Sequence, residues 1–132
     1  MSGEKNIQFV QEMYRKFQSG DIPGLLAGLT ENCAWDHRGA DLPFNGMFKG
    51  PEGVGKFFGQ LADLVEPLKF EPREFISDGD KVVALGSFEW KVKSNGNTYG
   101  ADFAHVFTIT EGKASAFKPY WDQASAVAAF AG

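Results

Sequence analysis

Cysteine is nearly absent from the sequence, which contains Cys33 and no other among its 132 residues. A disulfide within the chain is therefore excluded, and the fold must rest on an apolar core, which a chain of this length can bury. Apolar runs are also short, because none approaches the about 20 residues that a membrane-spanning helix needs. The sequence predicts a single domain over residues 1–132 that is stabilised by packing.

Basic residues are fewer than acidic ones. Thirteen lysine and arginine residues stand against seventeen acidic ones, which gives a net charge of −4. This sign does not suit a surface that binds phosphates, so we expect no nucleic-acid partner. The first residues contain no apolar stretch of the signal-peptide kind, and we therefore expect a cytoplasmic protein that does not associate with membranes.

Histidine is limited to His37 and His105, which lie far apart in the chain. Neither belongs to a His-x-x-x-His spacing, and no Cys-x-x-Cys pair is present, so we expect no metal site. The glycines of residues 50–55 resemble a phosphate-binding loop only in part, because the required lysine is missing. We therefore expect a protein that works without a cofactor.

Aromatic residues, in contrast, are abundant, with 13 phenylalanines, three tryptophans and three tyrosines. They are spread along the chain instead of being concentrated in one motif. Large aromatic side chains can fill a core, and they also line the apolar pockets that bind small molecules. Composition alone leaves both uses open.

The pattern of apolar residues changes once along the chain. Spacings of three and four predict helices over residues 4–18, 22–29 and 51–66, with a strand over 33–38 and a loop over 39–50 between the last two helices. Alternation then predicts strands over 68–76, 81–93, 98–110 and 113–121, joined by glycine-containing turns, before a short C-terminal helix over 123–130. The expected fold is α+β: a cone-shaped, curved antiparallel sheet wrapped around a long N-terminal helix.

Several short motifs follow one another in a definite order. They are Ser19-Gly20-Asp21, Cys33-Ala34-Trp35-Asp36, Phe48-Lys49-Gly50-Pro51-Glu52, Asp78-Gly79-Asp80, His105-Val106-Phe107 and Tyr120-Trp121-Asp122. In this order the sequence resembles the SnoaL-like and ketosteroid isomerase-like superfamily, of the nuclear transport factor two-like fold, over nearly the whole chain. The resemblance implies a pocket at the open end of the cone, and it implies a homodimer.

The resemblance also indicates where acid–base groups would lie. Ketosteroid isomerase uses an aspartate base and an oxyanion hole made of a tyrosine and a protonated aspartic acid. The position of the base falls on His37, with Asp36 one residue before it. The position of the protonated acid falls on His105 if the following turn is one residue shorter, and otherwise on Ala104. Strand alternation favours His105, which shares the more apolar face.

The remaining catalytic positions of the family fall mostly on residues that differ from those of its known enzymes. The oxyanion tyrosine falls on Met13 or, one residue later, on Tyr14, so the isomerase pattern is not preserved. The positions of the water-activating relay in the family's epoxide hydrolases fall near Gly86, Phe88 and Pro119, which cannot transfer protons. Tyr14 shares an apolar helix stripe, and its buried phenol would need a hydrogen-bond partner in the cavity.

These considerations give one leading hypothesis and two alternatives. The leading one is an isomerase, cyclase or lyase of the polyketide cyclase-like kind that acts on a small, apolar, carbonyl-bearing molecule. Its catalytic residues are His37, His105, Tyr14 and Asp36. The substrate-binding residues are expected to be Phe17, Trp35, Phe57, Phe58, Phe88, Trp90, Phe103, Phe107 and Tyr120. The alternatives are a protein that binds the same ligand without turnover and a dimeric interaction protein. Tyr99, beside a turn, is expected to be half exposed.

Overall fold

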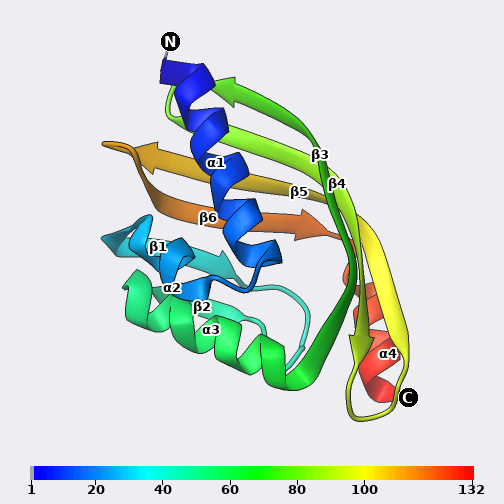
Figure 1. The fold of residues 1–132 in the computed structure, drawn as a ribbon. Coiled ribbons are helices and arrows are strands. Elements are labelled where there is room, and N and C mark those ends of the chain that lie inside the picture. The colour runs from blue at the N-terminus through cyan, green and yellow to red at the C-terminus, as the bar shows by residue number, and fades with distance from the viewer. Residues whose placement is uncertain (1) are drawn as a thin grey trace.

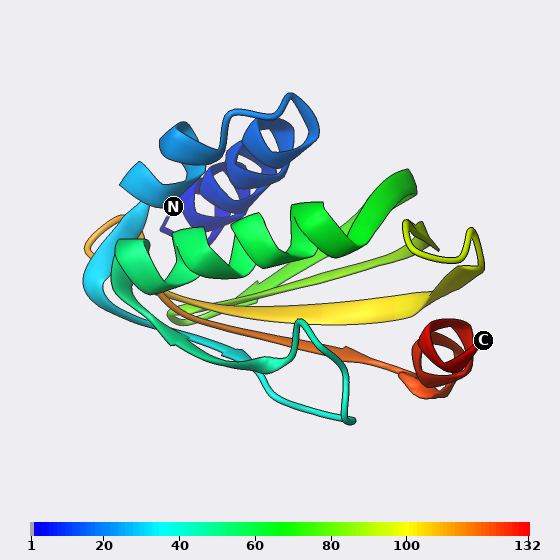
Figure 2. The same cartoon turned by 90° about the horizontal axis from the view of Figure 1, so that it is seen from below.

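The computed structural model describes residues 2–132 and consists of three helices on one face of a curved sheet, with a fourth helix at its end. Helix α1 (Ser2–Gln18), α2 (Ile22–Ala27) and α3 (Gly50–Leu64) cover the concave face, as Figures 1 and 2 show. Helix α4 (Ala124–Ala131) lies beyond the edge of this layer, beside the ends of the long strands. The convex face of the sheet carries no helix in these views. The predicted α+β fold is confirmed.

The helices follow from local sequence signals. In α1 the apolar stripe buries Val10, Met13 and Tyr14. Helix α2 begins after Asp21, whose carboxylate accepts a hydrogen bond from the Gly24 backbone N–H at 2.9 Å. It ends two residues earlier than expected, at Ala27, because the next strand begins almost at once. No helix within residues 2–132 is long and apolar enough to cross a membrane.

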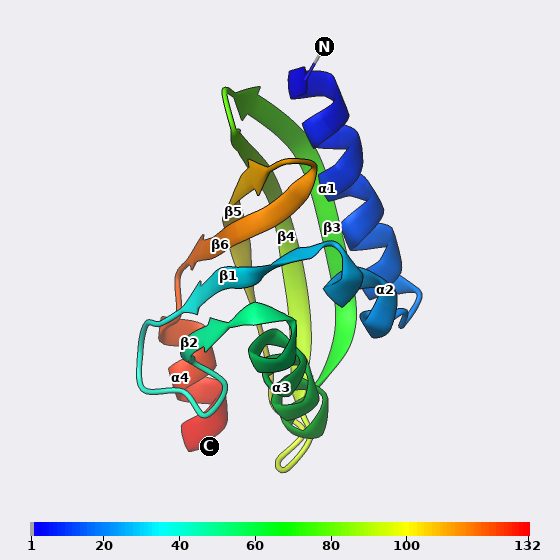
Figure 3. The ribbon, with the colours of Figure 1, turned by 90° about the vertical axis from the view of Figure 1, so that its left-hand side faces the viewer.

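The sheet has six strands in the order β2-β1-β6-β5-β4-β3. Their bounds are β1 Leu29–His37, β2 Gly46–Lys49, β3 Val65–Asp78, β4 Lys81–Val92, β5 Thr98–Thr110 and β6 Lys113–Trp121. Strands β3 to β6 form the predicted antiparallel meander. Strand β1 pairs in parallel with β6, so the sheet is mixed instead of wholly antiparallel (Figure 3). The expected loop over residues 39–50 also contains β2, which pairs antiparallel with β1.

The register of the sheet determines which side chains face the helices. Ala84, His105 and Pro119 lie opposite one another on three neighbouring strands. Alternation places His105 on the same face as Phe103 and Phe107, both buried beneath the helices. The core divides into two apolar clusters, one under α1 and α3 and the other toward α4. His105 therefore lies on the more apolar strand face, as predicted, and this is the concave face of the sheet.

Candidate functional site

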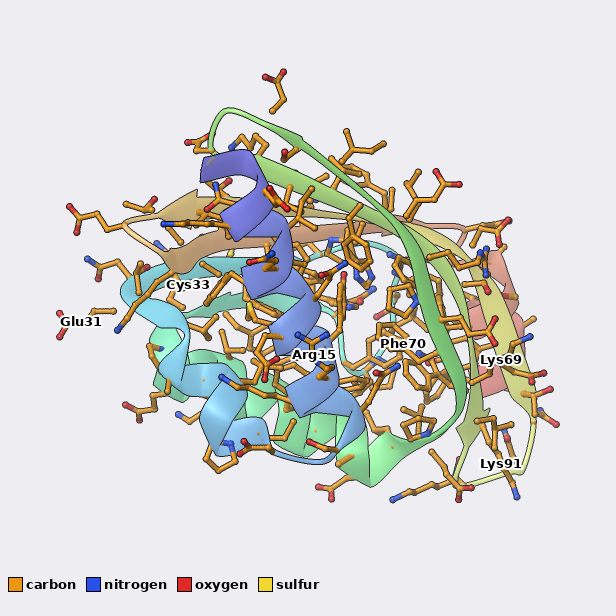
Figure 4. The ribbon with its side chains drawn as sticks, turned by 45° about the horizontal axis from the view of Figure 1, so that its top comes forward. Arg15, Glu31, Cys33, Lys69, Phe70 and Lys91 are labelled. Carbon is orange, nitrogen blue, oxygen red and sulfur yellow. The ribbon has the colours of Figure 1, made fainter. Side chains whose placement is uncertain are left out.

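A cavity of about 100 Å³ lies between the concave face of the sheet and helices α1 and α3. Its walls are almost entirely aromatic or aliphatic, and His37 and His105 supply the two imidazole rings among them. Figure 4 shows how strand β3 contributes to this wall, since Phe70 reaches inward while Lys69 points outward. The cavity has the concave, apolar character of small-molecule binding sites.

His105 forms a hydrogen-bonded pair with Tyr14 of α1. The phenol oxygen of Tyr14 lies 2.8 Å from Nδ1 of His105. The imidazole stacks on Phe103, with ring centroids 4.0 Å apart, and meets the edge of Phe117 at 5.1 Å. Burial among these rings, with a smaller contribution from the charge of His37, lowers the pKa of His105 from its ordinary 6.5 to about 3. The ring is therefore neutral at pH 7.

The contact with Tyr14 also determines which nitrogen of His105 carries the proton. Burial raises the pKa of Tyr14 well above its ordinary value, so the phenol keeps its hydrogen. Nδ1 of His105 is the hydrogen-bond partner of that phenol within residues 2–132. Because a buried phenol hydrogen needs an acceptor, the phenol donates to Nδ1, and the neutral imidazole then carries its own hydrogen on Nε2. His105 thus presents an N–H donor on the nitrogen that Tyr14 leaves free.

His37 is held by a chain of amide groups from two distant segments. Its Nδ1 lies 2.8 Å from Oδ1 of Asn45. The amide nitrogen of Asn45 donates to the Ala40 carbonyl at 2.8 Å and to Oε1 of Gln123 at 2.9 Å. The same Oε1 accepts a hydrogen bond from the Ala40 backbone N–H at 2.8 Å. The chain therefore runs from the start of α4 to the end of β1.

The backbone N–H of Ala40 determines the direction of this chain. Because that group can only donate, the atom of Gln123 that it contacts must be the oxygen, and the Asn45 atom beside that oxygen must be the NH₂ group. Oδ1 of Asn45 is then an acceptor, and Nδ1 of His37 must carry a hydrogen. The Nε2 lone pair of His37 remains free. The two histidines consequently hold opposite tautomers, which suit a base and a donor.

The pKa of His37 also lies below its ordinary 6.5. Burial is the main cause, and the hydrogen bond to Asn45 and the negative charge of Asp36 oppose it. The ring packs against Phe57, with centroids 4.7 Å apart, and against the edge of Phe44 at 5.7 Å. A neutral imidazole with a free Nε2 can accept a proton near neutral pH.

Asp36 lies apart from this arrangement, as strand alternation predicts. Its carboxylate accepts hydrogen bonds from Arg38 at 2.8 and 2.9 Å, and Lys118 Nζ lies 3.4 Å away. The Arg38 guanidinium holds the pKa of the Asp36 carboxyl well below its usual range. Asp36 does not line the cavity. The structure brings together His37, His105 and Tyr14 but not the fourth candidate.

Comparison with known protein families identifies the family of this chain. A family model described as SnoaL-like domain matches residues 10–117. The chain belongs to the SnoaL-like family. The resemblance found in the sequence is thereby confirmed. None of the curated proteins matches this chain.

Solved structures similar to this SnoaL-like protein cover almost its whole length. An NTF2-like protein from Burkholderia xenovorans LB400 is 27% identical, with a TM-score of 0.88 and 98% of each chain covered. An NTF2-like protein of unknown function from Burkholderia pseudomallei K96243 is 29% identical, with a TM-score of 0.88 and coverage of 97% of this chain and 98% of that one. TerC, co-crystallised with polyporic acid, is 27% identical, with a TM-score of 0.83 and coverage of 97% and 99%.

Most of the expected substrate-binding residues line the cavity of this SnoaL-like domain. Those that do are Phe17, Trp35, Phe57, Phe58, Phe88, Trp90 and Phe107. Phe103 lies behind the His105 ring and supports it by stacking. Tyr120 is 52% exposed and lies outside the cavity, because it faces the convex side of the sheet, where the Lys118 ammonium lies over its ring. Phe103 and Tyr120 are therefore not part of the lining.

Other lining residues were not anticipated. They are Met13, Leu25, Phe44, Leu61, Phe70, Tyr99, Pro119 and Trp121, together with Phe117. The expected half-exposed position of Tyr99 is wrong, since the side chain is buried against Trp121 and Phe130 of the C-terminal segment. Strand alternation with Phe103 and His105 is the signal that could have placed Tyr99 inward. Asn45 and Gln123 carry no comparable signal.

Metal-ligating side chains do not cluster in the part of the chain that the structure describes. No group of three or more His, Cys, Asp or Glu side chains in residues 2–132 could hold a metal ion. Cys33 is buried, and burial raises the pKa of its thiol to about 11. Its thiol is thus unsuited to nucleophilic chemistry at neutral pH.

Proposed function

We propose that this SnoaL-like protein catalyses cofactor-free proton transfer next to the carbonyl group of a small apolar molecule. The observation that carries the proposal is the pair of histidines in one apolar cavity, each with Nδ1 hydrogen-bonded so that the two rings hold opposite tautomers. One ring can then take a proton while the other donates a hydrogen bond. These are the two groups that such a reaction needs.

In the proposed reaction His37 is the base. Its Nε2 removes a proton from the carbon next to the carbonyl, and the electron pair of that C–H bond moves into a C=C bond as the carbonyl oxygen becomes negative. The Nε2–H of His105 donates a hydrogen bond to this oxygen. Because its pKa is low, His105 stays neutral and acts as a donor, while Tyr14 keeps its Nδ1 occupied.

The fate of the resulting enolate distinguishes the reaction types. Return of the proton to another carbon gives an isomerase, and attack of the enolate carbon on a second carbonyl gives a cyclase. Expulsion of a leaving group from the neighbouring carbon gives a lyase. TerC, which is 27% identical and was co-crystallised with the small organic compound polyporic acid, supports a small organic ligand for the cavity. Asp36 takes no part, because Arg38 and Lys118 engage its carboxylate on the opposite face.

The shared first step can be tested without knowledge of the natural substrate. The probe is α-tetralone in heavy water, and the measurement is the rate at which the hydrogens next to its carbonyl exchange for deuterium, followed by proton NMR. We expect exchange above the buffer rate. His37→Ala should lower it by about 100-fold or more, and His105→Ala by about 100-fold. Asp36→Asn is the matched control on the same strand and should change the rate only slightly, because Asp36 acts on His37 through its charge alone.

The pH dependence follows from the pKa of the base. Since burial lowers the pKa of His37 from its ordinary 6.5, the exchange rate should fall as the pH decreases, with a midpoint below the 6.5 of a free imidazole, because protonation removes the base. If α-tetralone binds but wild-type exchange equals that of the buffer, the catalytic proposal is refuted. The protein would then be a ligand-binding member of its family.

We further propose that the protein is a homodimer through the convex face of the sheet. Apolar residues lie opposite one another on this face, as in the row Ile76, Val83 and Val106 and the pair Leu85 and Ala104. Ile76 is 53% exposed. A second copy with the same row would cover them. Light scattering should report about twice the 14.5 kDa of one chain, and a mass of one chain would exclude the dimer.

A further inference from the structure

Two polar atoms are enclosed in the core without a hydrogen-bond partner. They are Nε1 of Trp35 and the phenol oxygen of Tyr99, and they are the two buried side-chain polar atoms of this kind in residues 2–132. Both side chains are 4% exposed. A buried polar group without a partner destabilises the folded chain, and most buried polar side-chain atoms in proteins have a partner. The pair therefore calls for a physical explanation.

Both side chains line the same cavity as the histidines, but they do so from different parts of the core. Trp35 on β1 belongs to the cluster under α1 and α3, where its ring stacks on Phe117 with centroids 4.0 Å apart. Tyr99 on β5 belongs to the cluster toward α4 and packs against Trp121 and Phe130. The cavity extends to both clusters. A ligand that fills it contacts the two side chains at two different places.

The chemistry of the two atoms defines what they can bind. The indole Nε1–H is a donor only, so its partner must be an acceptor. Burial raises the pKa of Tyr99 well above its ordinary value, which keeps the phenol protonated and able to donate. Two separate oxygen atoms of a ligand would satisfy both groups. Neither oxygen can be the reacting carbonyl, because that oxygen is already assigned to His105.

We propose that Trp35 Nε1–H and the Tyr99 hydroxyl are substrate-binding groups that select a ring ketone carrying two further oxygen atoms, one for each group. The inference rests on the proposed function, because it takes the reacting carbonyl to lie at the histidines. In this proposal the aromatic walls of the cavity contact the carbon skeleton of the ligand, and Trp35 and Tyr99 bind its oxygen substituents. In this structure neighbouring side chains cover both atoms, so a ligand reaches them only if those side chains turn aside.

The proposal predicts an unusual combination of effects for Tyr99→Phe, which deletes the hydroxyl alone. The variant loses an unpaired buried group, so its midpoint of thermal unfolding should equal that of the wild type or exceed it by about 4 °C. Its affinity for an oxygen-rich ligand should nevertheless fall by about tenfold, as expected for one lost hydrogen bond. Tyr120→Phe removes an exposed phenol outside the cavity and is the matched control for both measurements.

The binding experiment compares α-tetralone with its 5,7-dihydroxy derivative by calorimetric titration of the full chain. Wild type should bind the dihydroxy ketone about tenfold or more tightly than α-tetralone. Tyr99→Phe and Trp35→Phe should each reduce this preference, with the affinity for α-tetralone unchanged in Tyr99→Phe. Trp90→Phe removes a similar ring from the same wall without removing an enclosed polar atom, and it separates lost packing from the lost N–H.

The outcomes distinguish this inference from the proposed function. Equal affinity of the wild type for both ketones would overturn the inference, even if α-tetralone still exchanges deuterium in a reaction that depends on His37. A fall in stability of Tyr99→Phe with an unchanged preference would overturn it for that residue. For Trp35, a fall in stability with an unchanged preference would overturn the inference as well, because a neighbouring ring face would then be the acceptor of the N–H. Loss of exchange alone would refute the proposed function and leave the preference between the two ketones as the separate test of recognition.

Discussion

The low pKa of His105 makes a prediction about stability at acidic pH. In the unfolded chain the imidazole should titrate near 6.5, whereas in the folded chain its pKa is about 3. Between these values the unfolded chain binds a proton that the folded chain does not. The free energy of unfolding must therefore decrease as the pH falls from 6.5 toward 3.

The magnitude follows from proton linkage. Full binding of one extra proton by the unfolded chain changes the free energy of unfolding by about 1.4 kcal/mol for each pH unit. Because the unfolded imidazole is half protonated at pH 6.5, the loss attributable to His105 between pH 6.5 and 4.5 is about 2 kcal/mol. The ordinary pKa values of carboxyl groups lie below this range, and groups other than His105 contribute equally to a variant that lacks only this imidazole.

The matched variant is His105→Asn, whose side-chain oxygen can take the place of Nδ1 as the acceptor for Tyr14. Urea unfolding of both proteins at pH 6.5, 5.5 and 4.5 gives the difference in stability at each pH. We expect the wild type to lose about 2 kcal/mol more than the variant over this range. Identical losses would show that His105 titrates in the folded chain as it does in the unfolded one, which would refute the burial argument.

Three further predictions concern the groups around the site and one turn. Tyr14→Phe leaves Nδ1 of His105 without its partner, so urea unfolding should show a loss of about 1 to 3 kcal/mol; an unchanged stability would contradict the importance of this bond. Gln123→Met removes the acceptor that orients the amide chain and should shift His37 toward a mixture of tautomers in nitrogen NMR spectra, whereas Gln123→Glu keeps an acceptor and should preserve the wild-type form. Gly50→Ala should lower the thermal midpoint, because Gly50 has a φ of +68° and a Cβ there would lie 2.6 Å from the Glu31 carbonyl oxygen; an unchanged midpoint would show that the turn relaxes freely.

Much of the architecture could be predicted because it depends on local patterns. Strands β5 and β6 have the bounds expected from alternation between glycine-containing turns. Strand β2 was missed because its four residues carry no recognisable alternation and depend on pairing with β1. The parallel pairing of β1 with β6 joins segments far apart in the sequence, and no local pattern indicates it. Periodicity predicts elements, but it does not specify which distant elements pair.

In the candidate site, too, local patterns predict some features, whereas contacts between distant segments determine others. Alternation placed His105 on the apolar face and put Asp36 opposite His37, and the structure agrees with both. Tyr99 follows the same alternation, but its nearness to a turn favours an exposed position, and helix α4 covers it. The contact between Asn45 and Gln123 joins a loop to the C-terminal segment through two neutral amides. Such a contact has no signature in composition or spacing, so the hydrogen-bonded support of the proposed base could be found only in three dimensions.

Nitrogen NMR of the two imidazole rings across a pH titration tests the central claim most directly. The account predicts that His37 carries its hydrogen on Nδ1, that His105 carries it on Nε2, that both pKa values lie below 6.5, and that α-tetralone shifts the signals of both rings. Two rings with the same mixture of tautomers, pKa values near 6.5 and no response to the ketone would contradict it.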